Sequence, residues 1–147
     1  MEYLKIFFDG GSRGNPGPSS VGVVLYDHKG NKIEEISEYI GNMTNNAAEY
    51  IALEKALDAA EKYDVKKIIL ITDSQLVHNQ LKKTWKLKNQ NLQKIYIKII
   101  EKLKRYSLVD LRLVPREQNK EADILVNRAL DGLNNKDQGI SFGNIED

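Results

Sequence analysis

An uninterrupted apolar run at Ile68–Thr72 constrains the fold more than any other feature of the sequence. A short run without alternation is typical of a strand that is buried on both faces in a parallel sheet. The helical stripe of small apolar residues within 45–63 predicts a helix that packs on such a sheet. With 147 residues, the chain is long enough for one domain around a single core.

The rest of the chain predicts a regular order of elements around that strand. We expect strands at 3–9, 21–26 and 32–40, the helix at 45–63, the strand at 68–72, helices at 74–83 and 92–104, a strand at 111–114 and a helix at 120–130. This order predicts an α/β domain with a mixed sheet. The residues that follow are polar and weakly patterned, and we expect them to form a flexible tail.

The composition excludes several kinds of chemistry. The sequence has no cysteine, which eliminates disulfides, thiol nucleophiles and cysteine-based zinc or iron–sulfur sites. No apolar run approaches the ~20 residues of a spanning helix, and the N-terminus lacks the pattern of a secretory signal. We therefore expect a cytoplasmic protein without membrane partners, whose chemistry uses carboxylates, hydroxyls, amides, lysine and arginine.

The net charge of +1 conceals an uneven distribution along the chain. Residues 66–105 contain eleven basic side chains and only two acidic ones, whereas the segments on either side are acidic. A basic block in a neutral protein indicates an anionic partner such as a nucleic acid. A solvated, lysine-rich helix face would give the same pattern.

Four acidic residues lie at positions that suggest a common site. Asp9 and Asp73 each follow a predicted strand, and the carboxyl ends of strands line the ligand crevice of an open α/β sheet. Glu49 lies on the apolar stripe of its helix, and Asp123 lies in the first turn or so of the last helix. Each acid also has an ordinary explanation, since Asp forms turns after strands and acids cap or complement helix N-termini.

Convergence of these four acids would favour a metal site over the ordinary explanations. Four carboxylates at one end of a small sheet would repel one another unless a cation neutralised them. Carboxylates are the ligands that Mg²⁺ prefers in proteins, and a pair of such ions is a common solution for hydrolysis of phosphodiesters.

The pattern Gly10–Gly14 also fits a serine nucleophile elbow around Ser12, but Pro16 and Pro18 exclude the helix that must follow it.

Four segments resemble, in order and spacing, the motifs of ribonuclease H type 1: residues 9–18, 44–49, 72–75 and 119–123. The resemblance covers about residues 1–132, and it leaves 133–147 as the polar tail. It implies the RNase H-like fold, with a five-stranded mixed sheet and helices on both faces. It further implies a monomeric endonuclease that hydrolyses the RNA strand of RNA–DNA hybrids, by a two-metal-ion mechanism that leaves 5′-phosphate and 3′-hydroxyl ends.

By motif position, the resemblance assigns the catalytic, metal-binding acids to Asp9, Glu49, Asp73 and Asp123, with two Mg²⁺ ions that Mn²⁺ can replace. Amides can both donate to and accept from a ribose 2′-hydroxyl, so they suit the recognition of RNA. Thr44 resembles a DNA-phosphate contact, and Trp85 an aromatic contact to the DNA strand, although a core position for Trp85 fits equally. The full set of substrate contacts that the resemblance implies is Gly10, Gly11, Ser12, Asn15, Thr44, Asn45, Asn46, Gln75 and Trp85.

The sequence departs from the family pattern in two places. Many members carry a longer basic protrusion where only 84–91 remains here, which implies weaker hybrid binding or a broader specificity that includes double-stranded RNA. Many members also have a histidine before the last acid, where this chain offers Arg116. Arginine does not relay protons at neutral pH, but it binds phosphate, so we expect Arg116 to assist phosphate positioning or product release.

Two alternatives to a hybrid-cutting ribonuclease remain at this point. The protein could be a non-cleaving nucleic-acid-binding module or a DNA-directed nuclease of the same fold.

Overall fold

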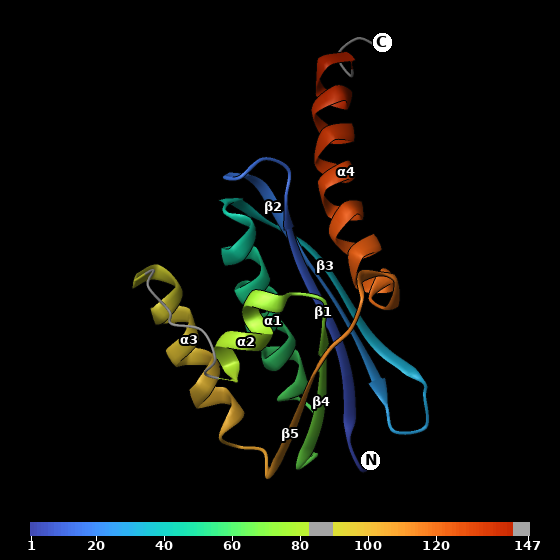
Figure 1. Cartoon of the computed structure of the whole chain (residues 1–147). Helices are drawn as coiled ribbons and strands as arrows, with labels where there is room; N and C mark the ends of the chain where they lie inside the picture. The colour runs from blue at the N-terminus through green and yellow to red at the C-terminus, as the bar shows by residue number, and fades with distance from the viewer. Residues whose placement is uncertain (83–89, 143–147) are drawn as a thin grey trace.

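The computed structural model describes residues 1–82 and 90–142 of the chain. In that part of the chain, five strands and four helices follow one another in the order shown in Figure 1. Their bounds are β1 (Leu4–Ser12), β2 (Gly17–Asp27), β3 (Lys32–Met43), α1 (Asn45–Ala60), β4 (Lys67–Thr72), α2 (Gln75–Leu81), α3 (Gln90–Leu103), β5 (Leu108–Leu113) and α4 (Lys120–Phe142), with a 3-10 turn at Arg116–Gln118 before α4.

The strands form one mixed sheet in the order β3-β2-β1-β4-β5. β1 pairs with β2 in the antiparallel sense and with β4 in the parallel sense, so it lies between the two halves of the sheet. β4 has Ile68 and Leu70 fully buried and Ile69 and Ile71 almost so. The prediction of a mixed sheet that contains a parallel strand buried on both faces is therefore confirmed.

Helices cover both faces of this sheet, as Figure 1 shows. α1 packs on β1 and β2 and is itself covered by α3 on the same side, while α4 lies across β2 and β3 on the opposite side. The largest fully buried side chains include Tyr50, Leu53 and Leu57 of α1, which meet Phe8 and Ile6 of β1. The RNase H-like architecture predicted from the sequence is confirmed.

At Gly22 the backbone of α4 approaches that of β2 closely. A Cβ on Gly22 of β2 would lie 2.1 Å from the carbonyl oxygen of Ala122, a distance that no side chain can occupy. The hydroxyls of Ser20 and Ser37 donate to the carbonyls of Val126 and Leu125, each at 2.6 Å. These contacts fix α4 on the strands at the point where it carries Asp123.

Several element boundaries differ from the sequence predictions. β1 continues beyond Asp9 to Ser12 because it keeps its antiparallel partner β2, which itself begins at Gly17. The sequence favours Asn45 or Asn46 as the cap of α1, and this is wrong, because Thr44 caps the helix by accepting from Ala47 N at 3.1 Å. α4 runs on to Phe142, well past its predicted end near 130, in a segment that contains no proline.

None of the helices within the described residues combines the length and the apolar surface needed to cross a membrane.

Candidate active site

Asp9 lies in the middle of the sheet at the point where one of the two partners of β1 stops. The parallel pairing with β4 ends at Phe7 with Ile71, whereas the antiparallel pairing with β2 continues through Asp9. Asp9 therefore lies where β1 and β4 are no longer paired, and the residue is only 7% exposed. Such an opening at the carboxyl ends of parallel strands is where open α/β sheets bind ligands.

Glu49 reaches β1 from the first turns of α1. Its Oε1 accepts a hydrogen bond of 2.9 Å from Gly10 N, in a buried position. Close packing makes this contact possible, since a Cβ on Gly10 would lie 2.2 Å from the main chain of Ala48. The capping-box explanation of Glu49 is wrong, because its carboxylate binds the neighbouring strand and Thr44 caps the helix.

Asp73 follows the last residue of β4, and the buried side chain of Asn119, to which the sequence assigns no such role, holds it. Asn119 is 1% exposed, and its Nδ2 donates to the carbonyl of Phe8 at 3.0 Å. A hydrogen bond from Asn119 also lowers the pKa of Asp73, against the raising effect of burial. The sequence predicts Asn119 as the cap of the last helix and includes it in the motif at 119–123, but its contact with Phe8 depends on the fold and has no local signal.

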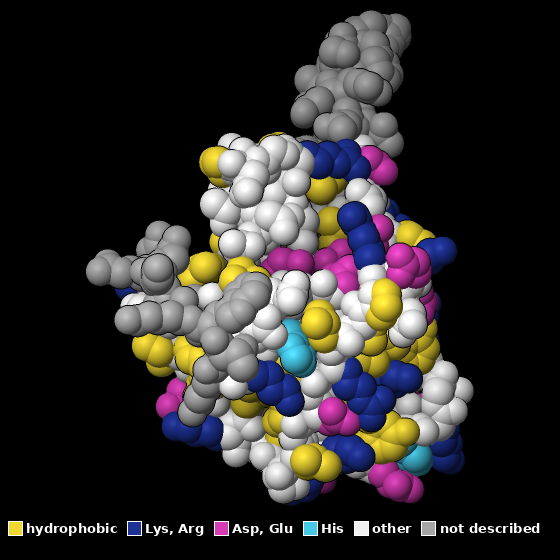
Figure 2. All heavy atoms as spheres, viewed as in Figure 1, with side chains coloured by type: hydrophobic (Ala, Val, Ile, Leu, Met, Phe, Trp, Pro, Cys, Tyr) yellow, Lys and Arg dark blue, Asp and Glu magenta, His cyan; other side chains and the backbone are white. Residues whose placement is uncertain are grey.

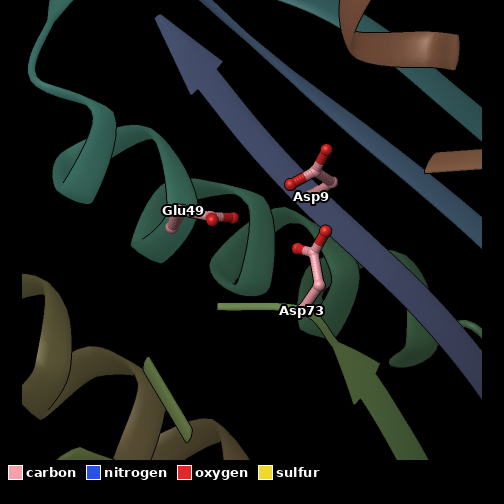
Figure 3. A group of neighbouring side chains, drawn as sticks. All are labelled: Asp9, Glu49 and Asp73. Carbon is pink, nitrogen blue, oxygen red and sulfur yellow. The ribbon is translucent and has the colours of Figure 1, made fainter. Parts of the chain in front are cut away.

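The carboxylates of Asp9, Glu49 and Asp73 meet in front of the sheet, as Figure 3 shows. One oxygen from each lies within 4.8 Å of the others. The three side chains come from β1, α1 and the end of β4, so the tertiary fold, and no local segment, brings them together. Three hard oxygen ligands at this spacing fit a divalent cation such as Mg²⁺ or Mn²⁺, and the cluster is compatible with one.

Burial and mutual repulsion make this cluster unfavourable in its fully ionised form. Burial, and after it the charge of Glu49 and the other nearby acids, raises the pKa of Asp9 to about 9. Burial also raises the pKa of Glu49 to about 7, although the hydrogen bond from Gly10 opposes this. Full ionisation of the cluster is therefore unfavourable in the absence of a cation, and a bound cation would supply the positive charge that offsets this cost.

Asp123, the fourth predicted acid, stands apart from the three. It lies on α4 with its side chain 28% exposed, and one of its oxygens is 3.6 Å from a guanidinium nitrogen of Arg116. It lines the same cavity of about 330 Å³ as Asp9 and Asp73, and its charge contributes to the raised pKa of both. Figure 2 shows acidic side chains gathered in a hollow on this face of the molecule.

Four of the nine predicted substrate contacts line this cavity. Gly10, Gly11, Ser12 and Asn45 line it, and the Asn15 Oδ1 atom accepts from Asn45 N at 3.0 Å. The predicted contacts that remain are exposed at the N-terminal ends of two helices, where Thr44 caps α1, Asn46 lies in its first turn and Gln75 begins α2. Trp85 lies outside the described residues, together with Lys83, Lys86 and Lys88.

Part of the basic block of the sequence is engaged within the fold. Lys102 of α3 contacts Asp58 of α1 at 2.7 Å, and Arg105 lies 3.7 Å from Glu61. These ion pairs join α3 and the residues that follow it to α1 and its C-cap Glu61, so these two basic side chains take part in the packing of the fold. An anionic partner of the basic block stays a prediction. Lys94 and Lys98 of α3 are exposed and form no such ion pair with a described residue, so their charges face the solvent.

Comparison with known proteins agrees with this site and fold. The sequence profile of the reverse transcriptase-like family matches residues 7–129. The chain belongs to this family. It is 43% identical over 128 residues to ribonuclease HI of Halobacterium salinarum, an alignment that covers 87% of this chain and 64% of that protein. The chain thus spans less than two thirds of the length of that relative.

Solved structures extend the similarity to the whole fold. The crystal structure of RNase H1 from the same archaeon superposes with a TM-score of 0.85 at 42% identity, covering 88% of this chain and 98% of that one. LC11-RNase H1, solved in complex with an RNA/DNA hybrid, gives a TM-score of 0.83 at 39% identity, with 88% and 98% coverage. The resemblance to ribonuclease H type 1 is therefore confirmed.

Proposed function

We propose that this protein is a metal-dependent endoribonuclease that hydrolyses the RNA strand of RNA–DNA hybrids and leaves 5′-phosphate and 3′-hydroxyl ends. The observation that carries the proposal is the convergence of Asp9, Glu49 and Asp73 within 4.8 Å at an open cavity. The 43% identity to a protein named ribonuclease HI and the likeness to a structure that holds an RNA/DNA hybrid support the choice of substrate.

The four acids are the residues that we assign to metal binding. Asp9, Glu49 and Asp73 offer the shared set of oxygens, and Asp123 offers a further carboxylate from the other wall of the cavity. Two divalent ions, Mg²⁺ or Mn²⁺, would activate a water molecule and stabilise the leaving oxygen. The rigid contacts of Glu49 to Gly10 and of Asn119 to Phe8 hold these carboxylates in place before the substrate arrives.

The exposed amides around the cavity suit recognition of the ribose. Asn15, Asn45, Asn46 and Gln75 present groups that both donate and accept, as a 2′-hydroxyl requires. Main-chain groups of Gly10 and Gly11 and the hydroxyl of Ser12 lie on the same wall as Asn45. We assign the strand that these residues contact as RNA, and Thr44 and Trp85 as contacts to the DNA strand.

Arg116 is a cationic residue that lines the cavity of the proposed active site. Its side chain is 77% exposed, lies 3.6 Å from Asp123 and lowers the pKa of Glu49 and Asp73 through its charge. An exposed guanidinium at the edge of an acidic site can bind the scissile or departing phosphate. Arg116→Ala should therefore reduce turnover by about tenfold, which corresponds to roughly 1.4 kcal/mol. Unchanged turnover would remove Arg116 from the mechanism.

End-labelled 20-mer substrates test the proposal directly. RNA–DNA hybrid, double-stranded RNA and double-stranded DNA are incubated with wild type and with Asp73→Asn, in Mg²⁺, Mn²⁺ or EDTA. Asp64→Asn is the matched control, because it makes the same chemical change at an exposed acid beyond α1. We expect metal-dependent cutting of the RNA strand of the hybrid by wild type and by Asp64→Asn, and none by Asp73→Asn.

The other outcomes identify the alternative functions. Binding of hybrid without cutting in either metal would favour a non-cleaving nucleic-acid-binding module. Cutting of DNA would favour a DNA-directed nuclease, and cutting of double-stranded RNA as well would extend the substrate range. The same proposal includes a monomeric state and a cytoplasmic location, which sedimentation and cell fractionation test.

A further inference from the structure

Arg13 is a basic residue on the wall of the proposed active site with no place in the function described so far. It lies between β1 and β2 and lines the same cavity as Asp9, Asp73 and Asp123. Its neighbours in the sequence are the predicted substrate contacts Ser12 and Asn15. The guanidinium of Arg13 is positively charged, so it can bind a phosphate.

The main chain holds Arg13 in a fixed position. Arg13 N donates to the Pro18 carbonyl at 2.8 Å and so closes the turn between β1 and β2. Gly14 has a φ of +102°, and a Cβ on Gly17 would lie 2.3 Å from the carbonyl oxygen of Arg13, so both glycines are needed for this turn. The Ser12 hydroxyl contacts the Met43 carbonyl at 3.0 Å and ties the turn to β3.

The guanidinium of Arg13 is directed to α4 by two polar side chains. Its Nη2 atom donates to the Asp131 Oδ1 at 2.7 Å and to the Asn127 Oδ1 at 3.3 Å. The side chains of Arg13 and Asp131 are 39% and 62% exposed, so water and ligands reach this ion pair. Because both contacts use Nη2, Nε and Nη1 make no hydrogen bond to any residue that the structure describes.

The partners of Arg13 lie on the same face of α4 as Asp123. Asp123, Asn127 and Asp131 are spaced by four residues, so they follow one another along one side of the helix. At a rise of 1.5 Å per residue, Asp131 is about 12 Å along α4 from Asp123. The guanidinium of Arg13 is thus held about two helical turns along α4 from Asp123, on the wall of the same cavity.

We propose that Arg13 binds a backbone phosphate that flanks the scissile one, and that the carboxylate of Asp131 occupies Arg13 when no substrate is bound. This proposal rests on the proposed function and adds a specific contact to it. Arginine presents a planar fork of donors that matches a phosphate, and an exposed carboxylate is a weak competitor for it. Substrate binding therefore exchanges one anion for another on a guanidinium that is already positioned.

A purely structural ion pair between the turn and α4 is the competing explanation, and two substitutions separate the explanations. Arg13→Ala and Asp131→Asn both break the ion pair, so a structural role predicts the same direction of change for both. Exchange with phosphate predicts opposite directions, because Asp131→Asn leaves the guanidinium in place and removes its competitor. Arg105→Ala is a matched control, since Arg105 is also 39% exposed and also faces an acid, Glu61.

Binding of a fluorescent 20-base-pair RNA–DNA hybrid is measured by anisotropy at several salt concentrations. All variants carry Asp73→Asn in the full chain, so that binding is read without cutting. We expect Arg13→Ala to weaken binding about tenfold and to reduce the slope of log K against log salt by about one, as loss of one phosphate contact requires. Asp131→Asn should tighten binding about twofold to fivefold, and Arg105→Ala should change it by less than twofold.

Weaker binding by both Arg13→Ala and Asp131→Asn, or no change in either, would overturn the proposal. Hybrids with one neutral methylphosphonate at successive positions of the RNA or the DNA strand then identify the phosphate, because the effect of Arg13→Ala disappears where the contacted charge is gone. If Arg13→Ala weakened binding equally at every methylphosphonate position, the proposed contact between Arg13 and one phosphate would also be overturned. Wild-type cleavage of the same hybrid is measured in parallel, so failure of the nuclease activity is distinguished from failure of the Arg13 contact.

Discussion

Replacing Asp9 by asparagine should make the metal-free protein more stable. Residue Asp9 is 7% exposed, and the pKa of its carboxyl is raised from 3.8 to about 9. In the unfolded chain the same group ionises near pH 4. Folding at neutral pH therefore forces Asp9 to take up a proton or to ionise against burial and like charges, and asparagine, which has no charge, avoids this cost.

The magnitude follows from the pKa of Asp9 and the pH. Each pKa unit corresponds to about 1.4 kcal/mol, so holding Asp9 protonated at pH 7 costs at most about 4 kcal/mol relative to the unfolded chain. Movement of the carboxyl toward the open cavity reduces this cost, so we expect Asp9→Asn to raise the free energy of unfolding by about 2–4 kcal/mol. The raised pKa means that the folded state binds more protons, so the stability of wild type falls as the pH rises from about 4 to 9.

Urea unfolding followed by circular dichroism, in EDTA and from pH 4 to 8.5, measures the stability gain of Asp9→Asn and the pH dependence of wild-type stability. The difference between Asp9→Asn and wild type should be small near pH 4 and should grow as the pH rises. Asp64→Asn, at an exposed acid, is the control and should follow wild type at every pH. Equal free energies of unfolding for Asp9→Asn and wild type across this pH range would refute the argument that the buried carboxyl of Asp9 lowers the stability of the fold.

Three further outcomes test the site and its supports. Saturating Mn²⁺ should stabilise wild type by about 3 kcal/mol at a hundredfold excess over the Kd, and Asp9→Asn by clearly less, as calorimetric melting would record. Gly22→Ala should cost about 2–4 kcal/mol in urea unfolding because its Cβ meets the α4 backbone, whereas Gly132→Ala, in a helix with open space around it, should gain about 0.5–1 kcal/mol. Asn119→Ala should lower kcat with little change in KM, because it leaves Asp73 without its amide partner; steady-state cleavage in Mg²⁺ measures this, and a change confined to KM would contradict it.

Residues with a strong local signal are the ones whose positions could be predicted from the sequence. The apolar run at Ile68–Thr72 predicted the doubly buried strand, and the motif spacing predicted that Asp9, Glu49 and Asp73 lie together. Glu49 was recognisable because a charge on the apolar face of a helix needs an explanation, and its contact with Gly10 supplies one.

Features that depend on a partner distant in sequence were missed. The continuation of β1 past Asp9 depends on pairing with β2, and the role of Asn119 depends on the Phe8 carbonyl. Asn45 and Asn46 are as good helix caps as Thr44 by type, so only the path of the chain decides among them. The length of α4 beyond 130 was also missed, because its polar residues give no periodic signal for a helix.

The parallel pairing of β1 with β4 also determines when a folding chain can become active. Leu4 pairs with Ile68, so the three strands of the N-terminal meander and α1 must be synthesised before this contact can form. Closing so long a loop costs entropy that only the completed core offsets. Asp9 and Asp73 stay apart until then, so an incomplete chain cannot hold the cluster of three carboxylates that we assign to metal binding.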